Sequence, residues 1–231
     1  MGIFDKLRGN KAATPEERRK KNNEYIKSNG IACLESLPMI EASTSVKLKS
    51  MDAICRRAIA CLLSIQLACD IEEQNDYGES RELFLNLLKN YNVENFLLEK
   101  EKRLFEDKYS PQDVIDVVWT YEAYWALIWV LGLIDDIKMP DTICDCRKAI
   151  TFVGDCKDYE DFKSQCKIRN IEEILDMLDL YYRYHWACVE KRVQPDTNIG
   201  PLNPDVVVER RKGLEWVISD IEEWDEISLD T

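Results

Sequence analysis

The stretch that decides the fold is VVWTYEAYWALIWVLGLI, residues 117–134, which carries a single charge, Glu122. Its eighteen residues border on the length of a membrane span. The glutamate inside it, the flanking Asp116 and Asp135 and the lack of a basic flank argue against a span. A helix that is apolar nearly all round is instead typical of a protein core. We therefore expect a buried, Trp-rich central helix and no membrane span.

Capping signals predict helices on both sides of this stretch. Ser110-Pro111-Gln112-Asp113 opens the central helix with a hydroxyl cap, a proline and a capping-box acid. Thr14-Pro15 opens a first helix in the same way, and Gly30 ends it. Apolar periodicity and caps predict the other helices at about 50–69, 80–91, 93–105, from 170 onward and 203–221. We expect the segment 141–167 to be the least regular.

The resulting prediction is an all-α fold. No run of alternating β-branched residues is long enough for a strand, and eight glycines and seven prolines leave little material for long loops. We expect residues 1–13 to be a flexible N-terminal segment. Residues 14–231 are expected to form a single compact multi-helix domain around the central helix.

The formal net charge of −13 limits the classes of partner. Such a surface repels polyphosphate, so we expect no nucleic-acid binding. Part of the acidic excess lies near the C-terminus and predicts either a solvated face or a surface presented to a protein partner. Nine cysteines without a secretory signal favour a reducing, cytoplasmic location. The oligomeric state is left open.

Glu122 is the most informative single residue. At 100° per residue it falls opposite Asp113 and Asp116, in line with Trp125 and Trp129. A carboxylate on the apolar side of a helix must be paired, hydrogen-bonded or protonated. It is therefore either a structural ion pair or a functional carboxylate in an aromatic pocket.

Two arginines are placed to meet this carboxylate. Arg210 lies within the apolar stripe of the last predicted helix, and Arg57 flanks the stripe of the second. An arginine in an apolar stripe either extends its head to water or meets a buried acid. We expect Glu122 to pair with Arg210 in preference to Arg57.

His185 is the only histidine and lies in the middle of an apolar stripe. It is either a hydrogen-bonded core residue or a general acid or base, for which Glu122 is the natural carboxylate neighbour. Asp179 and Arg183, four residues apart toward the polar side of the same helix, are expected to form an ordinary surface pair.

The cysteines raise the question of a metal site. Zinc ribbons supply two close pairs of ligands, whereas Cys144-x-Cys146 is one close pair, followed singly by Cys156 and Cys166. We therefore expect no metal and no cofactor. No phosphate loop, zinc-protease motif or nucleophile elbow is present.

Together these observations favour a non-enzymatic intracellular interaction or regulatory module with an acidic surface, bound to a protein partner. The alternative is a hydrolase-like enzyme that uses Glu122 and His185 in an aromatic cleft, with Arg210 and Arg57 completing a buried polar cluster.

An ordered series of motifs runs along the chain: Pro38-Met39-Ile40, Arg57-Ala58, Trp119-x-x-Glu122-Ala123-x-Trp125-Ala126-Leu127-x-Trp129-x-Leu131-Gly132, Asp179-x-x-Tyr182-Arg183-x-His185-Trp186-Ala187, Glu209-Arg210-Arg211-x-x-Leu214-x-Trp216, Trp224-Asp225 and Asp230-Thr231. This series resembles the bacterial family catalogued as domain of unknown function 4272. The resemblance extends from about Lys20 to the end of the chain and implies a single domain, but it brings no known activity, substrate or catalytic residue.

Overall fold

Most of the stretch 117–134 lies in helix α5, Pro111–Val130, in a computed structural model that describes residues 13–231. The helix begins at the predicted capping box, where the Ser110 hydroxyl accepts the backbone N–H of Asp113 and the Asp113 carboxylate accepts that of Ser110. Every residue from 121 to 131 is buried. Among the large apolar side chains of 117–134, Trp119 is the exposed one, with 37% of its surface exposed.

The fold is all-α, as predicted, and residues 13–231 contain no strand. No helix in this range combines the length and apolar character needed to cross a membrane. The expected flexible segment 1–13 lies, apart from residue 13, outside the described residues.

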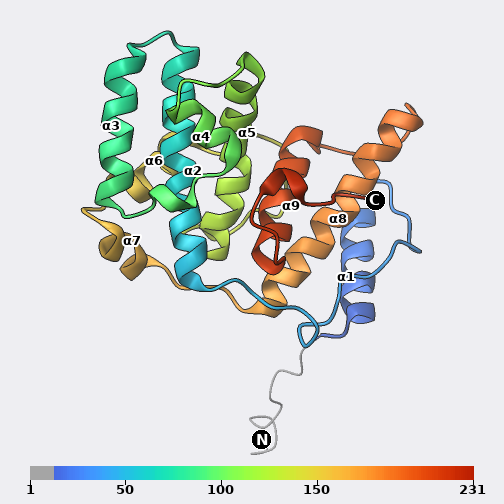
Figure 1. Ribbon diagram of the computed structural model, residues 1–231. Helices are drawn as coiled ribbons and strands as arrows, with labels where there is room; N and C mark the ends of the chain where they lie inside the picture. Colours follow the sequence, from blue (N-terminus) through green and yellow to red (C-terminus); the bar gives the residue numbers. More distant parts are fainter. Residues whose placement is uncertain (1–12) are drawn as a thin grey trace, which may run out of the picture.

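Helix α5 lies between α2 (Met51–Glu72) and α9 (Pro204–Ile218) (Figure 1). Further helices extend this arrangement on both sides. On one side α8 packs on α9 and α1 packs on α8, and on the other α3 packs on α2. One hydrophobic cluster takes residues from all of them. The bounds are α1 Pro15–Ser28, α3 Tyr77–Asn90, α4 Glu99–Phe105 and α8 Ile171–Val193, with a 3-10 turn, η2, at Glu94–Phe96.

The segment 141–167 is more regular than expected. It contains α6 (Cys146–Gly154) and α7 (Tyr159–Gln165), each opened by an aspartate cap, Asp145 and Asp158. Each short helix buries one small apolar face, which includes Val153 in α6 and Phe162 in α7. Helices of two turns are held by tertiary packing, and their short periodic pattern is hard to recognise in the sequence.

The prediction that Asp179 and Arg183 form a surface pair is wrong. Both side chains are buried, and the Arg183 Nε and Nη2 atoms donate to the two carboxylate oxygens at 2.9 and 2.8 Å. Asn22 of α1 donates a third hydrogen bond to Asp179 at 2.9 Å. The reason is that α1 covers this face of α8, which the sequence alone leaves facing water.

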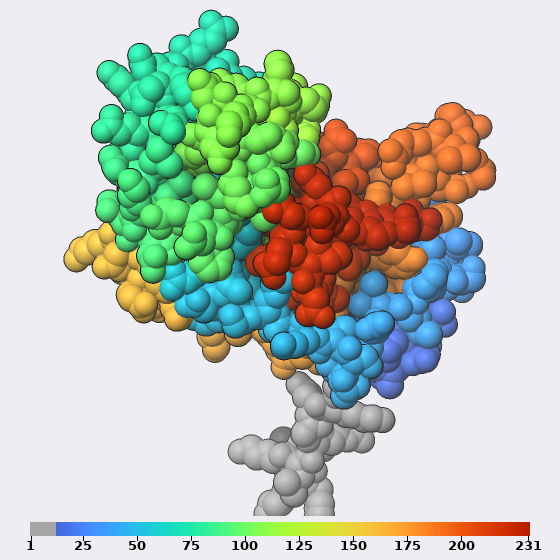
Figure 2. Space-filling model, viewed as in Figure 1, coloured from blue at the N-terminus to red at the C-terminus, as the bar shows by residue number. Residues whose placement is uncertain are grey.

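The chain beyond α9 forms a C-terminal strap, residues 219–231, because α9 ends at Ile218 and not near Ile221 as expected. Arg211 holds the strap through the carbonyl oxygens of Leu229 (3.0 Å) and Asp230 (3.2 Å). The strap contains one 3-10 turn, η3 (Trp224–Glu226), and Trp224 is buried. Figure 2 shows the strap, in red, packed against the green block that contains α3 and α4.

Gly213 sets the distance between α5 and α9. A Cβ atom at this position would lie 2.7 Å from the carbonyl oxygen of Ala123 and 3.1 Å from the Ala126 methyl group. Contacts that close to backbone atoms force the helices apart. The smallest residue is therefore needed at the crossing.

Gly213→Ala is expected to destabilise the protein by about 1–3 kcal/mol through overpacking, although alanine is the better helix former. Urea denaturation followed by circular dichroism measures the effect. Gly154→Ala is the matched control, because the nearest atom to a Cβ there is 3.8 Å away. Equal stabilities of the two variants would contradict this account of the crossing.

Candidate functional site

Glu122 is buried and pairs with Arg210, as predicted. The Arg210 Nε donates to Glu122 Oε2 at 2.8 Å, and the backbone N–H of Cys144 donates to Oε1 at 2.6 Å. Arg210 also donates through Nη2 to the carbonyl oxygen of Thr142 at 3.2 Å. The ion pair therefore joins α5, α9 and the loop that leads into α6.

Arg57 meets a different acid, Glu101 of α4. Both side chains are buried, and one of the two hydrogen bonds between them, from Nη1 to Oε2, measures 2.9 Å. Arg57 also donates to the carbonyl oxygen of Phe96 at 2.5 Å. Sequence reasoning missed Glu101 because it lies in a short, highly charged helix that gives no sign of an inward face.

His185 contacts Arg211, with 2.7 Å between its Nδ1 and the arginine Nη1. A guanidinium only donates, so Nδ1 is the acceptor and the ring is neutral in this contact. Burial, with the neighbouring charges of Arg211 and Arg192, lowers the pKa of His185 to about 4. No hydrogen bond joins His185 to Glu122 among the described residues. The four predicted residues therefore form three separate contacts, Glu122–Arg210, Arg57–Glu101 and His185–Arg211, and not one cluster.

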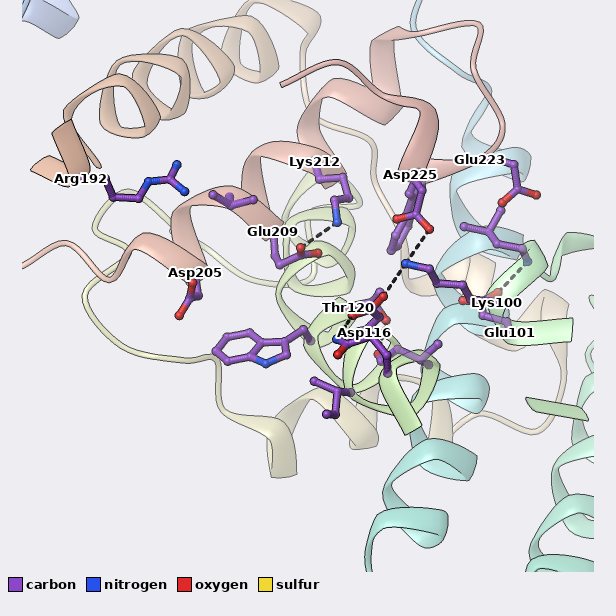
Figure 3. A pocket seen from close by; sticks show the side chains of 17 residues that line it. Lys100, Glu101, Asp116, Thr120, Arg192, Asp205, Glu209, Lys212, Glu223 and Asp225 are labelled. Atoms are coloured by element: carbon purple, nitrogen blue, oxygen red, sulfur yellow. Dashed lines mark hydrogen bonds and ion pairs between the residues drawn. The ribbon is translucent and has the colours of Figure 1, made fainter. Parts of the chain in front are cut away.

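An open cavity of about 500 Å³ lies elsewhere, between α4, α5, the end of α8, α9 and the strap. Figure 3 shows Asp205, Glu209 and Lys212 along α9, facing Asp116 and Thr120 of α5. The charged lining residues are six carboxylates, Glu101, Asp116, Asp205, Glu209, Glu223 and Asp225, and three cations, Lys100, Arg192 and Lys212. Its lining therefore carries an excess of negative charge.

Lys100 bridges two of these carboxylates. Its ammonium lies 2.5 Å from Asp116 and 2.9 Å from Asp225, so it ties the strap to α5 (Figure 3). Burial alone lowers the pKa of Lys100, but these two partners outweigh it and raise the pKa above its ordinary value. Lys100 is therefore charged at neutral pH.

Glu209 is a lining carboxylate with only one of its two oxygens hydrogen-bonded. Lys212 donates to its Oε1 at 2.7 Å, whereas the buried Oε2 has no hydrogen-bond partner in the described part of the chain. Burial raises the pKa of Glu209, and Lys212 offsets only part of that effect.

The cavity also has an apolar edge on α5. Ile115 and Trp119 are 46% and 37% exposed, although the other tryptophans and the tyrosines of this helix are buried. The two residues are four positions apart and so lie on one face, beside Asp116 and Thr120. This spacing is the signal by which sequence reasoning could have found the cavity. Assigning every tryptophan to the core hides that signal.

The cysteines of residues 13–231 form no metal centre. All nine are free thiols, and no three or more His, Cys, Asp or Glu side chains in residues 13–231 are grouped to hold a metal ion. Cys144 and Cys156 are buried, and Cys146 and Cys166 are partly exposed.

A family model described as a domain of unknown function (DUF4272) matches residues 18–227. The chain therefore belongs to this family, as its motifs indicated. A search of curated proteins and a search of solved structures found no match.

Glu122→Gln should destabilise the protein by about 3–5 kcal/mol, because it leaves the Arg210 guanidinium buried without its counter-charge. Adding Arg210→Met should recover part of this loss, since contacting sites are coupled. Asp176→Asn, which breaks the exposed pair with Lys21, is the control and should cost no more than about 1 kcal/mol. Denaturation curves that show additive costs for the two core changes would refute the coupling.

His185 should make stability depend on pH. Its folded pKa of about 4 lies below the unfolded value of about 6.5, so between these values only the unfolded chain takes up the proton. The contribution of neutral His185 to the free energy of unfolding is therefore complete above pH 6.5 and is lost as the pH falls to 4. His185→Gln, which can still accept a hydrogen bond from Arg211, should show a shallower loss in thermal unfolding. NMR of the single imidazole should find no titration between pH 8 and 5, and a midpoint near 6.5 would contradict the burial argument.

Proposed function

We propose that this protein is a non-enzymatic intracellular interaction module of a regulatory kind, whose acidic cavity binds a basic segment of a partner protein. The observation that carries the proposal is the excess of carboxylates around an open cavity that also exposes Trp119. Phosphate groups are repelled by the same lining, so nucleic acid is not the proposed ligand.

Charge complementarity is the first support. The Glu101 charge is already met by Arg57 beneath the cavity, and Lys100 and Lys212 each meet acids within it. Asp205 is exposed at the cavity and is left without a cation by these pairs. An ammonium or guanidinium group of a partner can supply that cation, and charge-assisted hydrogen bonds are the stronger kind.

The exposed aromatic edge is the second support. A lysine or arginine side chain has an apolar stem and a charged head. Trp119 and Ile115 offer a surface for the stem, and a tryptophan face attracts the head by about 0.5–2 kcal/mol. Aromatic anchors beside carboxylates therefore favour a basic residue over a small inorganic cation.

The positions of Glu122 and His185 favour this proposal over the hydrolase-like alternative. Each is hydrogen-bonded inside the core, to Arg210 and to Arg211, and neither lines the cavity. A general base must come within hydrogen-bond reach of a substrate proton, directly or through one water molecule. Buried groups that already bond to arginines do not offer that access.

Binding of a fluorescein-labelled nonapeptide of three Gly-Leu-Lys repeats, followed by fluorescence anisotropy, tests the proposal. The wild-type chain should bind it and ignore the matching Gly-Leu-Glu peptide. Asp205→Asn and Trp119→Ala should each weaken binding by about tenfold, because each removes about 1.4 kcal/mol of charge-assisted or cation–π interaction.

The controls are Glu82→Gln and Leu83→Ala, exposed residues on α3 that line no part of the cavity. These two substitutions resemble the cavity substitutions in kind but lie away from the cavity, so they should leave peptide binding unchanged. Equal weakening by the cavity and control variants would mean that the peptide binds the acidic surface at large. Failure of the wild-type chain to bind any lysine peptide would reject the proposed function.

A further inference from the structure

Two cysteines lie beside each other where the chain enters α6, apart from the acidic cavity. Cys144 is buried, and Cys146, the first residue of the helix, is partly exposed. Between them Asp145 has φ −73° and ψ 91°, close to an inverse γ-turn, which draws its two neighbours together. The Cys146 Sγ accordingly lies 3.7 Å from the carbonyl oxygen of Cys144. Cα atoms two positions apart are separated by at most about 7 Å, and this bend shortens the separation into the range of about 4.4–6.8 Å that a disulfide spans.

Cys146 combines access with a reactive thiol. A hydrogen bond with the Cys144 thiol lowers the pKa of Cys146 to about 7, although burial and the Glu122 charge oppose the shift. Its place at the start of α6 acts in the same direction as the hydrogen bond, because the free N–H groups of a helix start favour negative charge. In contrast, burial raises the pKa of two other partly exposed thiols, Cys33 and Cys69. Cys146 therefore has the larger thiolate fraction at neutral pH.

Cys144 is held where it can react next. Its backbone N–H donates to Glu122 at 2.6 Å, and its Sγ lies 3.9 Å from the carbonyl oxygen of Tyr121, so α5 fixes its position. The hydrogen bond with Cys146, together with burial and the Glu122 charge, raises the pKa of Cys144. Cys144 therefore keeps its proton while Cys146 is the thiolate.

We propose that these two residues form a redox site, at which a hydroperoxide oxidises Cys146 and Cys144 then closes a disulfide with it. In the first step the Cys146 thiolate attacks the terminal oxygen of the hydroperoxide. The O–O bond breaks, Cys146 becomes a sulfenic acid, and the leaving oxygen takes a proton from solvent. In the second step the Cys144 sulfur attacks the Cys146 sulfur, the S–O bond breaks, and the Cys144 proton leaves with the hydroxide as water. Two thiols are oxidised and one hydroperoxide is reduced.

A second pair of thiols in the same protein lacks this arrangement. Cys55 and Cys166 are also hydrogen-bonded neighbours, but Cys55 is completely buried and Cys166 follows the last residue of α7. The Cys166 Sγ lies 3.3 Å from the carbonyl oxygen of Phe162, at the negative end of that helix. The hydrogen bond with Cys55 raises the pKa of Cys166. The accessible sulfur of this pair is therefore the protonated one, which reacts slowly with a hydroperoxide.

Tryptic mapping of the wild-type protein after treatment with one equivalent of hydrogen peroxide tests the proposal. Residues 139–147 form one tryptic peptide, which contains Cys144 and Cys146 and no other cysteine. After alkylation of the denatured protein, this peptide should carry no alkyl group and be lighter than its dithiol form by two hydrogen atoms. Treatment with dithiothreitol before alkylation should restore both thiols. The separate peptides that carry Cys55 and Cys166 should be alkylated in either case.

Two variants separate the two steps. In Cys144→Ser the sulfenic acid of Cys146 should persist, and dimedone should trap it on peptide 139–147. In Cys146→Ser the Cys144 thiol should remain unoxidised after the same treatment. Cys166→Ser is the matched control, because it removes one thiol of the second pair, and it should leave the disulfide of peptide 139–147 unchanged.

Three results would overturn the proposal, and each can be obtained with the wild-type protein. The first is recovery of peptide 139–147 with both thiols alkylated after the peroxide treatment. The second is a disulfide that joins Cys146 to Cys69, since Cys144 would then not be the second thiol. The third is formation of a Cys55–Cys166 disulfide as fast as that within peptide 139–147, because access and thiolate character would then not select the site.

Discussion

The arrangement of the helices depends on how one buried carboxylate is satisfied. Glu122 sits in the most apolar helix of the chain, where an unpaired charge costs several kcal/mol. Arg210 of α9 and the backbone N–H of Cys144 supply its partners. These bonds fix α9 and the loop before α6 against α5 in one register. Gly213, three residues beyond Arg210, is what lets the two helices come close enough for the pair to form.

The cavity uses the ends of the same rigid elements. One face of the first turns of α5 points away from the core and exposes Ile115 and Trp119 beside Asp116, and α9 contributes Glu209 to the same cavity. Sites built on packed helices hold their geometry better than sites built on loops. Of these elements only the strap is irregular, and Arg211 holds it in place by donating hydrogen bonds to the carbonyl oxygens of Leu229 and Asp230.

The local signals in the sequence predicted the local structure well. The caps at Thr14, Ser110 and Asn170 all form, and the apolar run at 117–134 is largely buried. The position of Arg210 in an apolar stripe was enough to predict its pairing with Glu122. What failed depended on packing between distant segments: α1 covers Asp179, and the strap and α4 build the cavity. Charged residues on short helices carry no periodic signal of such contacts.

Because Lys100 bridges two carboxylates of the cavity, a cation that binds there exchanges with the Lys100 ammonium. Asp116 and Asp225 already share one ammonium, so a cation that displaces Lys100 from them replaces one ammonium with another. The released lysine gains conformational freedom in water, worth up to about 2 kcal/mol. Cations that enter the cavity are therefore distinguished by their shape and by their contact with the exposed Trp119.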